Sequence, residues 1–288
     1  MAAESRAAER RMLLTFAHPD DESFGMGGAI AKYVAEGVDV SLICTTNGDA
    51  GTIPQALRDQ YESIAALRLA ELDCASAKLG FKEVFKLGYK DSGMMGAEST
   101  NDPACSWYVW QNEPERLIAQ IEEIIRQVQP QVVVTFNEYG GYGHPDHIAV
   151  QAATVAAFNR VREGAADGEY QPQKLYYTNI PIGLIRFGIW RTRLRFKNPR
   201  KVGINKDIDM IAILDHAEPP NVRVNVTDYM DIWQEANACH ASQGGGGGFG
   251  PAWLRRLIGA RQGFRRVHPA PNHNRIDEDD LFDGVTLA

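Results

Sequence analysis

The chain has 288 residues, 44% of them hydrophobic and 23% charged, which is enough to bury an ordinary core as one large domain or as a domain with an appendage. Its formal net charge of −7 argues against a general nucleic-acid-binding protein. Residues 1–11 lack the apolar core of a secretory signal, and no apolar run approaches the length of a membrane span, so we expect a cytoplasmic protein.

The cysteines do not form a metal or redox motif. They are scattered, with no Cys-x-x-Cys spacing, and we expect them to be reduced core residues. They are Cys44, Cys74, Cys105 and Cys239.

The first element is a short apolar run at residues 12–16, which predicts a buried strand that ends before Pro19. A helix is expected over residues 29–36, ended by Gly37. The glycines between them do not make a dinucleotide fingerprint, because Ile30 stands where the third glycine is needed. We interpret Gly25, Gly27 and Gly28 as close packing of this helix on the strand.

Strands and helices alternate from there to residue 180. This order predicts an α/β fold with a Rossmann-like, mainly parallel sheet and helices on both faces. Residues 97–113 show no clear period and are a candidate lid. The further strands are expected at residues 38–45, 83–87, 131–136 and 174–178, and the helices at 54–79, 115–128 and 145–157.

The pattern changes beyond residue 180. A strand is expected at residues 222–226 and a helix at 227–242, followed by five consecutive glycines at 244–248 that resemble a flexible linker. We therefore divide the chain into a Rossmann-like, metal-binding catalytic domain at residues 1–180 and a smaller, substrate-side C-terminal region at residues 181–288.

Two similar motifs follow two predicted strands, Ala-His-Pro-Asp-Asp-Glu at 17–22 and Gly-His-Pro-Asp-His at 143–147. A single His-Pro-Asp often only caps a helix, but its repetition at two strand ends favours one metal site. His18, Asp21 and His147 would form a two-histidine, one-carboxylate set with coordination positions left open for water and substrate. Zinc, one ion per chain, is the expected cofactor, with other divalent ions such as Fe2+ as alternatives.

Other residues of the two motifs suggest the remaining chemistry. Asp20 is placed to take a proton from the metal-bound water, and His144 to stabilise an oxyanion or protonate the leaving group. Asp146 is a candidate to orient His144 or His18. Glu22 could support the ligands from behind or act only as an N-terminal helix charge, and we favour the helix charge. Arg68 is the only charge on an apolar helical stripe, and either pairs with Glu71 or faces the cleft.

Two rival functions stay open at this point. A two-histidine, one-carboxylate set also suits non-haem iron oxygenases, although those would be expected on an all-β scaffold. A non-enzymatic sugar-binding module with a structural metal is the other, although structural zinc is normally closed by four protein ligands.

Taken with Arg68-x-x-Glu71, Asp-Ser-Gly-Met at 91–94 and His-Ala-Ser-Gln at 240–243, the two motifs resemble the LmbE / PIG-L family of zinc-dependent N-acetylglucosaminyl deacetylases over nearly the whole chain. The motif at 91–94 and Gly-Gly-Tyr-Gly at 140–143 are most similar to its mycothiol branch, which holds a deacetylase and an amidase of mycothiol conjugates. The chain departs from that branch at residues 183–201 and 244–248.

The resemblance implies N-deacetylation of a small molecule or glycoconjugate that contains N-acetylglucosamine, with the conjugate amidase as the alternative. It implies zinc on His18, Asp21 and His147, Asp20 as general base, and His144 beside the charged intermediate. It also implies that Arg68 and Asp91 grip sugar hydroxyls and that Tyr142 closes on the substrate. The expected partner is the small amino-sugar substrate, and homo-oligomerisation stays open.

Basic residues are concentrated in two segments. Residues 181–201 hold seven basic residues and no acid, with Phe187, Trp190 and Phe196 among them, and residues 251–268 hold five and no acid, with Trp253 and Phe264. Such segments are either solvated surface that balances an acidic remainder, or a rim that favours an anionic aglycone or a membrane surface.

Overall fold

The computed structural model describes residues 9–203, 205–246 and 261–287, and in this part of the chain seven strands form one sheet in the order β3-β2-β1-β4-β5-β7-β6. The first five strands are mutually parallel where they pair. The predicted α/β fold class is therefore confirmed. The strands are β1 (Arg11–Phe16), β2 (Asp39–Thr46), β3 (Glu83–Tyr89), β4 (Val132–Thr135), β5 (Lys174–Thr178), β6 (Val222–Asn225) and β7 (Arg261–His268).

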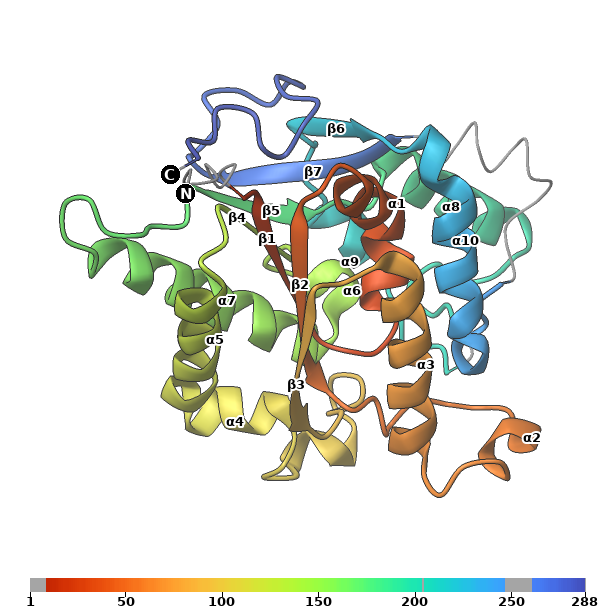
Figure 1. The fold of residues 1–288 in the computed structure, drawn as a ribbon. Helices are drawn as coiled ribbons and strands as arrows, with labels where there is room; N and C mark the ends of the chain where they lie inside the picture. The colour runs from red at the N-terminus through yellow and green to blue at the C-terminus, as the bar shows by residue number, and fades with distance from the viewer. Residues whose placement is uncertain (1–8, 204, 247–260, 288) are drawn as a thin grey trace.

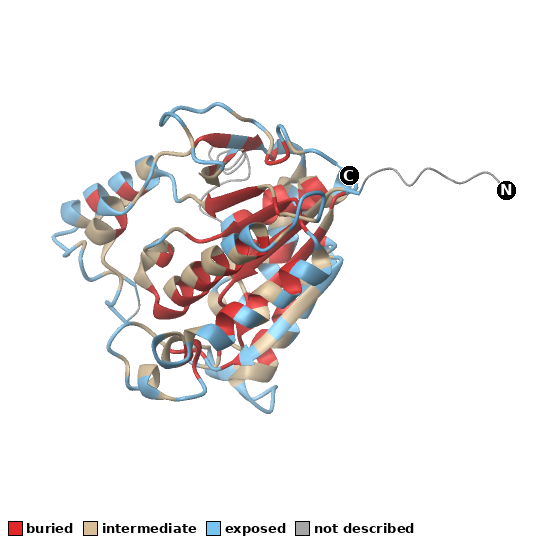
Figure 2. Cartoon of the chain, turned by 90° about the vertical axis from the view of Figure 1, so that its left-hand side faces the viewer, coloured by how far each residue is buried: buried red, intermediate tan, exposed pale blue. Residues whose placement is uncertain are grey.

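Helices cover both faces of the sheet. Figure 1 shows α4 (Ser106–Asn112), α5 (Pro114–Val128) and α7 (Pro145–Glu163) on one side, and α1 (Asp21–Ala35), α3 (Ile64–Leu79) and α10 (Met230–Cys239) on the other. The central strands are apolar runs because both faces are covered, and Figure 2 shows buried residues gathered on the strands and on the inward faces of the helices. The shorter helices are α2 (Gln55–Arg58), α6 (Gly140–Gly143), α8 (Ile182–Leu194) and α9 (Met210–Asp215), with 3-10 turns η1 (Glu98–Asn101), η2 (Thr227–Tyr229) and η3 (Ala241–Gln243).

The strand order determines where a ligand can bind. β1 pairs with β2 on one side and with β4 on the other. From the central pair β1 and β4, the sheet therefore extends in one direction through β2 and β3 and in the other through β5. In an open parallel sheet the crevice for a ligand lies at this reversal, outside the carboxyl ends of the strands. Both histidine motifs follow the carboxyl ends of β1 and β4.

Residues beyond 180 extend the same sheet. β7 pairs antiparallel with both β5 and β6, which the sequence analysis did not predict, and α8 and α9 were not predicted either. The predicted helix over 54–79 is two helices, because residues 59–63 break it and Ser63 caps α3 by accepting a hydrogen bond from the Ala66 backbone N–H at 3.0 Å. The candidate lid contains η1 and α4, where Ser106 and Val109 are buried.

The prediction of reduced cysteines is wrong for one pair. Cys74 of α3 and Cys239 of α10 form a disulfide with Cα atoms 5.7 Å apart, across two helices that pack together, so spacing in the sequence gave no sign of it. Cys44 and Cys105 are free and buried, as expected.

The cytoplasmic location stays a prediction. Within the described residues no helix has both the length and the apolar character needed to cross a bilayer.

Two glycines of α1 make room for a tryptophan. A Cβ on Gly27 would lie 2.5 Å from Cδ1 of Trp233, and one on Gly28 would lie 3.0 Å from its Cε3. The close packing predicted for Gly27 and Gly28 is therefore present, but against α10, not against a strand. The prediction is wrong for Gly25, where a Cβ would meet nothing within 4 Å. Trp233 also donates from its indole nitrogen to the Ser23 carbonyl at 2.5 Å.

We expect Gly27→Ala to lower the free energy of unfolding by about 1–3 kcal/mol, because the methyl group must displace the Trp233 ring. Gly25→Ala is the matched control in the same helix, since a Cβ there meets nothing within 4 Å. It should leave the stability unchanged or raise it slightly, because alanine favours helix. Urea unfolding of both variants measures the difference, and equal stabilities would contradict the packing.

Candidate metal centre

The first jaw of the centre is the turn between β1 and α1. β1 ends at Phe16, and α1 begins at Asp21. The His18 backbone N–H donates to Oδ2 of Asp21 at 2.7 Å, which holds the carboxylate over the turn. The turn therefore directs the side chains of His18 and Asp21 to the same point.

The second jaw is the loop between β4 and α7. His144 is the residue before the first turn of α7, Pro145 takes the first helical position, and His147 follows one turn on. Gly140 has a φ of 63°, and a Cβ there would lie 2.7 Å from Cβ of His147. Glycine is therefore required for the loop to pass behind this ring.

Three ligand atoms converge where the jaws meet. Nδ1 of His18 lies 2.9 Å from Nε2 of His147, and Oδ2 of Asp21 lies 3.6 Å from the first and 3.4 Å from the second. Ligands about 2.0–2.1 Å from a tetrahedral zinc ion are about 3.3–3.4 Å apart. The three spacings scatter around that value, so these residues fit a divalent ion on three protein ligands.

Two further groupings of ligand-type atoms also contain His18. His144 lies close enough to His18 and His147 to form a three-histidine set, and His18, Asp91, His144 and Asp146 form another. In the latter the Nε2 atom of His18 faces Oδ2 of Asp146 at 3.1 Å, which is the usual way in which a carboxylate orients a metal-bound histidine.

Asp146 is fully buried and held in place by the loop after β3 and by the start of α4. Its Oδ2 accepts the Ser92 backbone N–H at 2.9 Å, and its Oδ1 accepts the hydroxyl groups of Ser106, at 2.5 Å, and Ser92. Because both oxygens are used, Asp146 is fixed as an acceptor for His18. The candidate lid thus supplies Ser106 to the support of the centre.

Asp20 lies beside the three converging ligands in a rare backbone conformation. Its φ is 140°, a value that residues with a side chain seldom adopt. Burial raises the pKa of Asp20, and the positive charge of Arg68, 3.1 Å away, opposes that rise. Burial likewise raises the pKa of Asp21 to about 7. Both carboxylates would be stabilised in their charged form by a bound cation.

Arg68 reaches the turn from α3 and is only 3% exposed. Its guanidinium donates to the Pro19 carbonyl at 2.5 Å, to Asp20, and to the Gly48 carbonyl at 3.4 Å. A Cβ on Gly51 would lie 2.6 Å from Nη1 of Arg68, so the loop after β2 encloses this group. Arg68 is thus in contact with the predicted base, and its contact with a substrate stays a prediction.

His144, Asp91 and Tyr142 lie on the other side of the ligands. Nδ1 of His144 accepts the Asp146 backbone N–H at 3.3 Å, so a neutral ring carries its proton on Nε2. Burial, with the neighbouring His18, lowers the pKa of His144 to about 4, which favours the neutral form. Oδ1 of Asp91 lies 3.5 Å from Nε2 of His18, and the Tyr142 ring stands edge-on to His147.

A layer of support for the centre comes from the C-terminal region, and Glu22 belongs to it. The interpretation of Glu22 as only a helix charge is therefore wrong. Glu22 accepts the Asp20 backbone N–H at 3.0 Å and contacts Nε2 of His240 at 2.7 Å. Glu71 accepts both the backbone N–H and the hydroxyl of Ser242. The sequence signal was the motif at 240–243, which had no assigned contact.

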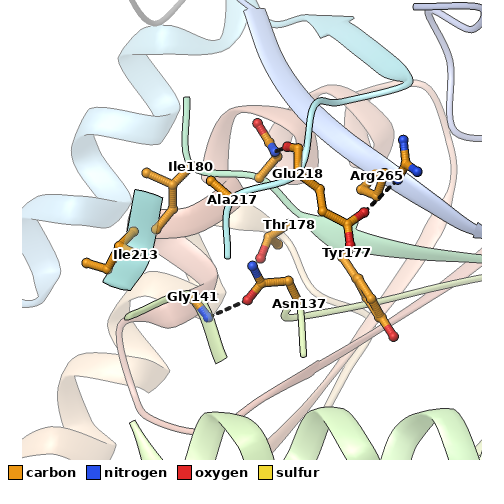
Figure 3. A pocket seen from close by; sticks show the side chains of 10 residues that line it. Asn137, Gly141, Tyr177, Thr178, Ile180, Ile213, Ala217, Glu218 and Arg265 are labelled. Carbon is orange, nitrogen blue, oxygen red and sulfur yellow. Dashed lines mark hydrogen bonds and ion pairs between the residues drawn. The ribbon is translucent and has the colours of Figure 1, made fainter. Parts of the chain in front are cut away.

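A surface hollow adjoins the loop of the second jaw. Figure 3 shows it at the carboxyl ends of β4 and β5, where Asn137 accepts a hydrogen bond from the Gly141 N–H at 2.7 Å. None of the predicted site residues lines it. It is lined by Asn137, Gly141, Tyr177, Thr178, Asn179, Ile180, Ile213, Ala217, Glu218 and Arg265.

Comparison with known proteins places about half of the chain in a known family. Residues 13–158 match the family described as PIG-L: GlcNAc-PI de-N-acetylase. A 1D-myo-inositol 2-acetamido-2-deoxy-alpha-D-glucopyranoside deacetylase of Thermomonospora curvata is 46% identical over 60% of this chain and 61% of its own length. The protein of that name from Rhodococcus jostii is 33% identical over 96% of this chain and 99% of its own.

The fold also matches a solved structure. An N,N'-diacetylchitobiose deacetylase from Pyrococcus horikoshii superposes with a TM-score of 0.56, at 21% identity, over 91% of this chain and 87% of that one. At this identity the likeness supports the α/β fold.

We expect His18→Ala and His147→Ala each to weaken zinc binding by more than about a hundredfold, because even the partners that orient a ligand contribute 10–100-fold. His144→Ala should keep the ion, and His216→Ala, an exposed histidine, is the control. Metal content after dialysis measures this. Loss of the ion from His144→Ala at the level of His147→Ala would favour the three-histidine set instead.

Proposed function

Because this chain belongs to the PIG-L family of GlcNAc-PI de-N-acetylases, we propose that its metal centre hydrolyses the N-acetyl group of an N-acetylglucosaminyl conjugate. The enzyme is a deacetylase, which cleaves a linear amide bond. The observation that supports the proposed site most directly is the convergence of His18, Asp21 and His147 beside the partly buried acid Asp20.

Zinc is the ion that we propose for the centre. Two imidazole nitrogens and one carboxylate oxygen form a donor set that suits it and leaves room for water and substrate. When bound, the ion would polarise the amide carbonyl and lower the pKa of a water molecule to about 7.

The chain's own residues would move the protons. Asp20 accepts one from the attacking water and returns it to the amine that leaves, so that amide and water give acetate and free amine. His144 donates a hydrogen bond from Nε2 to the carbonyl oxygen as negative charge develops there. Its neutral tautomer, set by the Asp146 backbone N–H, supplies that donor.

Sugar recognition is assigned to residues around the ligands. We propose that Asp91 and Arg68 each bind a sugar hydroxyl and that Tyr142 closes over the substrate. The curated relatives act, by name, on an acetamido-deoxyglucopyranoside of inositol. That glycoside is therefore the proposed substrate class, and not the thiol conjugate of an amidase.

The test is release of the free sugar amine from a panel of substrates: the inositol glycoside, N,N'-diacetylchitobiose, and a mycothiol conjugate. Acetate is the second product of deacetylation only, so its release separates a deacetylase from a conjugate amidase. We expect the wild-type chain with zinc to favour the inositol glycoside. Asp20→Asn should keep the metal and lose turnover by about 10²–10⁴-fold, because an amide cannot accept the proton. Asp59→Asn, at an exposed position, is the control. Equal loss of metal and turnover in Asp20→Asn would remove Asp20 from the role of base.

Arg68→Lys separates two roles of the arginine. We expect kcat to fall about tenfold, because lysine cannot hold the Pro19 carbonyl and the Asp20 carboxylate together, and KM to rise if the guanidinium also touches the sugar. Steady-state kinetics with a melting curve measure both. Unchanged kinetics with a lower melting temperature would show that Arg68 has only a structural role.

A further inference from the structure

The helix α8 presents an apolar face to solvent. Of twelve large hydrophobic side chains that are exposed in the described residues, five lie between Leu184 and Phe196. Leu184 is 47% exposed, Phe187 and Trp190 are each 56%, and Leu194 is 58%. Such clustering is uncommon on a folded surface and indicates an interaction site.

The apolar face lies opposite the buried face of the same helix. Ile185 and Ile189 are buried against Ile213 of α9. Successive helical residues are about 100° apart around the axis, so Phe187 lies about 180° from the midpoint of Ile185 and Ile189. Burial of α8 against its own fold therefore leaves this second apolar stripe uncovered within the described residues.

The stripe has arginines on both sides. By the same helical spacing Arg186 and Arg193 lie on one flank of Phe187, Trp190 and Leu194, and Arg191 lies with Leu184 on the other. Arg195 directly follows the last residue of the helix. We call these four arginines, together with Leu184, Phe187, Trp190 and Leu194, the α8 outer face. The rings of Phe187 and Trp190 pack together, with centroids 5.6 Å apart.

The positive charge of this face is not neutralised locally. Residues 181–201 contain no acid, and within the described residues only Arg200 of this segment forms an ion pair, with Asp209 at 2.8 Å. The second basic segment differs. Arg265 and Arg266 of β7 pair with Glu218, Asp277 and Glu278, and Trp253, Arg255 and Arg256 lie outside the described residues.

We propose that the α8 outer face docks the protein on a membrane surface that contains anionic phospholipid. Aromatic and leucine side chains flanked by arginines are typical of helices that lie in the lipid interface, with the apolar groups among acyl chains and the cations among phosphates. An excess of cations with no acid selects an anionic surface over a second copy of this chain, whose own face would carry the same charge.

The docked helix is tied to the metal centre through its core. The apolar cluster of Ile185, Ile189 and Ile213 also includes Tyr142, which stands beside His147. Docking of α8 on a membrane would thus place the membrane one layer of side chains away from Tyr142, which stands beside the proposed metal ligands. Binding to the membrane does not itself depend on the proposed activity.

Co-sedimentation with vesicles tests the proposal. The full chain should bind vesicles of phosphatidylcholine with phosphatidylglycerol, and bind vesicles of phosphatidylcholine alone much more weakly. Arg191→Gln with Arg193→Gln should weaken binding about thirtyfold, since each cation near an anionic surface contributes about fivefold. Lys78→Gln with Lys82→Gln, two exposed lysines of equal charge, is the matched control and should bind as the wild type does.

The apolar contribution has its own readout. Phe187→Ser with Trp190→Ser should abolish sedimentation with the anionic vesicles, while Ile232→Ser, at another exposed apolar position, should not. Brominated lipid should quench wild-type fluorescence more than that of Trp190→Phe, which retains the other four of the chain's five tryptophans. All variants should release acetate from a soluble substrate at the wild-type rate, so failure here is separable from failure of the proposed function.

Three results would overturn the proposal. The first is no binding to the anionic vesicles. If high salt then slows the reaction of a soluble anionic sugar, the basic residues act on a soluble anion and not on a membrane. The second is equal binding by the α8 variants and their controls. The third is a dimer that Trp190→Ser dissociates without vesicle binding, which would make this face a contact between copies.

Discussion

The centre depends on one strained residue. Asp20, at a φ of 140°, occupies a conformation that costs about 1–3 kcal/mol and persists only when its surroundings impose it. Its N–H is held by Glu22, its carbonyl accepts the N–H groups of Ser23 and Phe24, and its carboxylate and the preceding carbonyl are held by Arg68. With this conformation fixed, His18 and Asp21 can face one point while Asp20 stays beside it.

The constraint on Asp20 originates far along the chain. Glu22 can hold the turn because His240, more than 200 residues later, binds its other oxygen, and the packing of Trp233 on Gly27 brings α10 to that position. Burial lowers the pKa of His240, but Glu22 outweighs it and raises that pKa above its usual value, which favours a charged pair. The C-terminal region therefore helps to hold the turn that carries His18, Asp20 and Asp21.

Sequence reasoning predicted the features that depend on local pattern. The parallel strands and the end of α3 at Gly80 follow from apolar runs and a glycine signal, and the two jaws follow from motifs at strand ends. It did not predict β7, because this strand is rich in basic residues and its side chains alternate between buried and less buried positions over only part of its length. It did not predict α8 either, because this helix has apolar residues on two faces and so shows no single apolar stripe. The contacts of Arg68 with Asp20 and of Cys74 with Cys239 join distant elements, which no spacing encodes.

The charges of the centre explain why such a costly arrangement persists. Asp91, Asp146 and Glu22 are buried near Asp20 and Asp21, and buried carboxylates destabilise a fold unless they are paired. The histidines pair with some of them, and Arg68 compensates Asp20. The Asp21 pKa, raised to about 7 by burial, marks a charge that these partners leave uncompensated. A bound cation would supply the compensation, so the carboxylates that lower the stability of the fold without a cation are those that would favour binding of a metal.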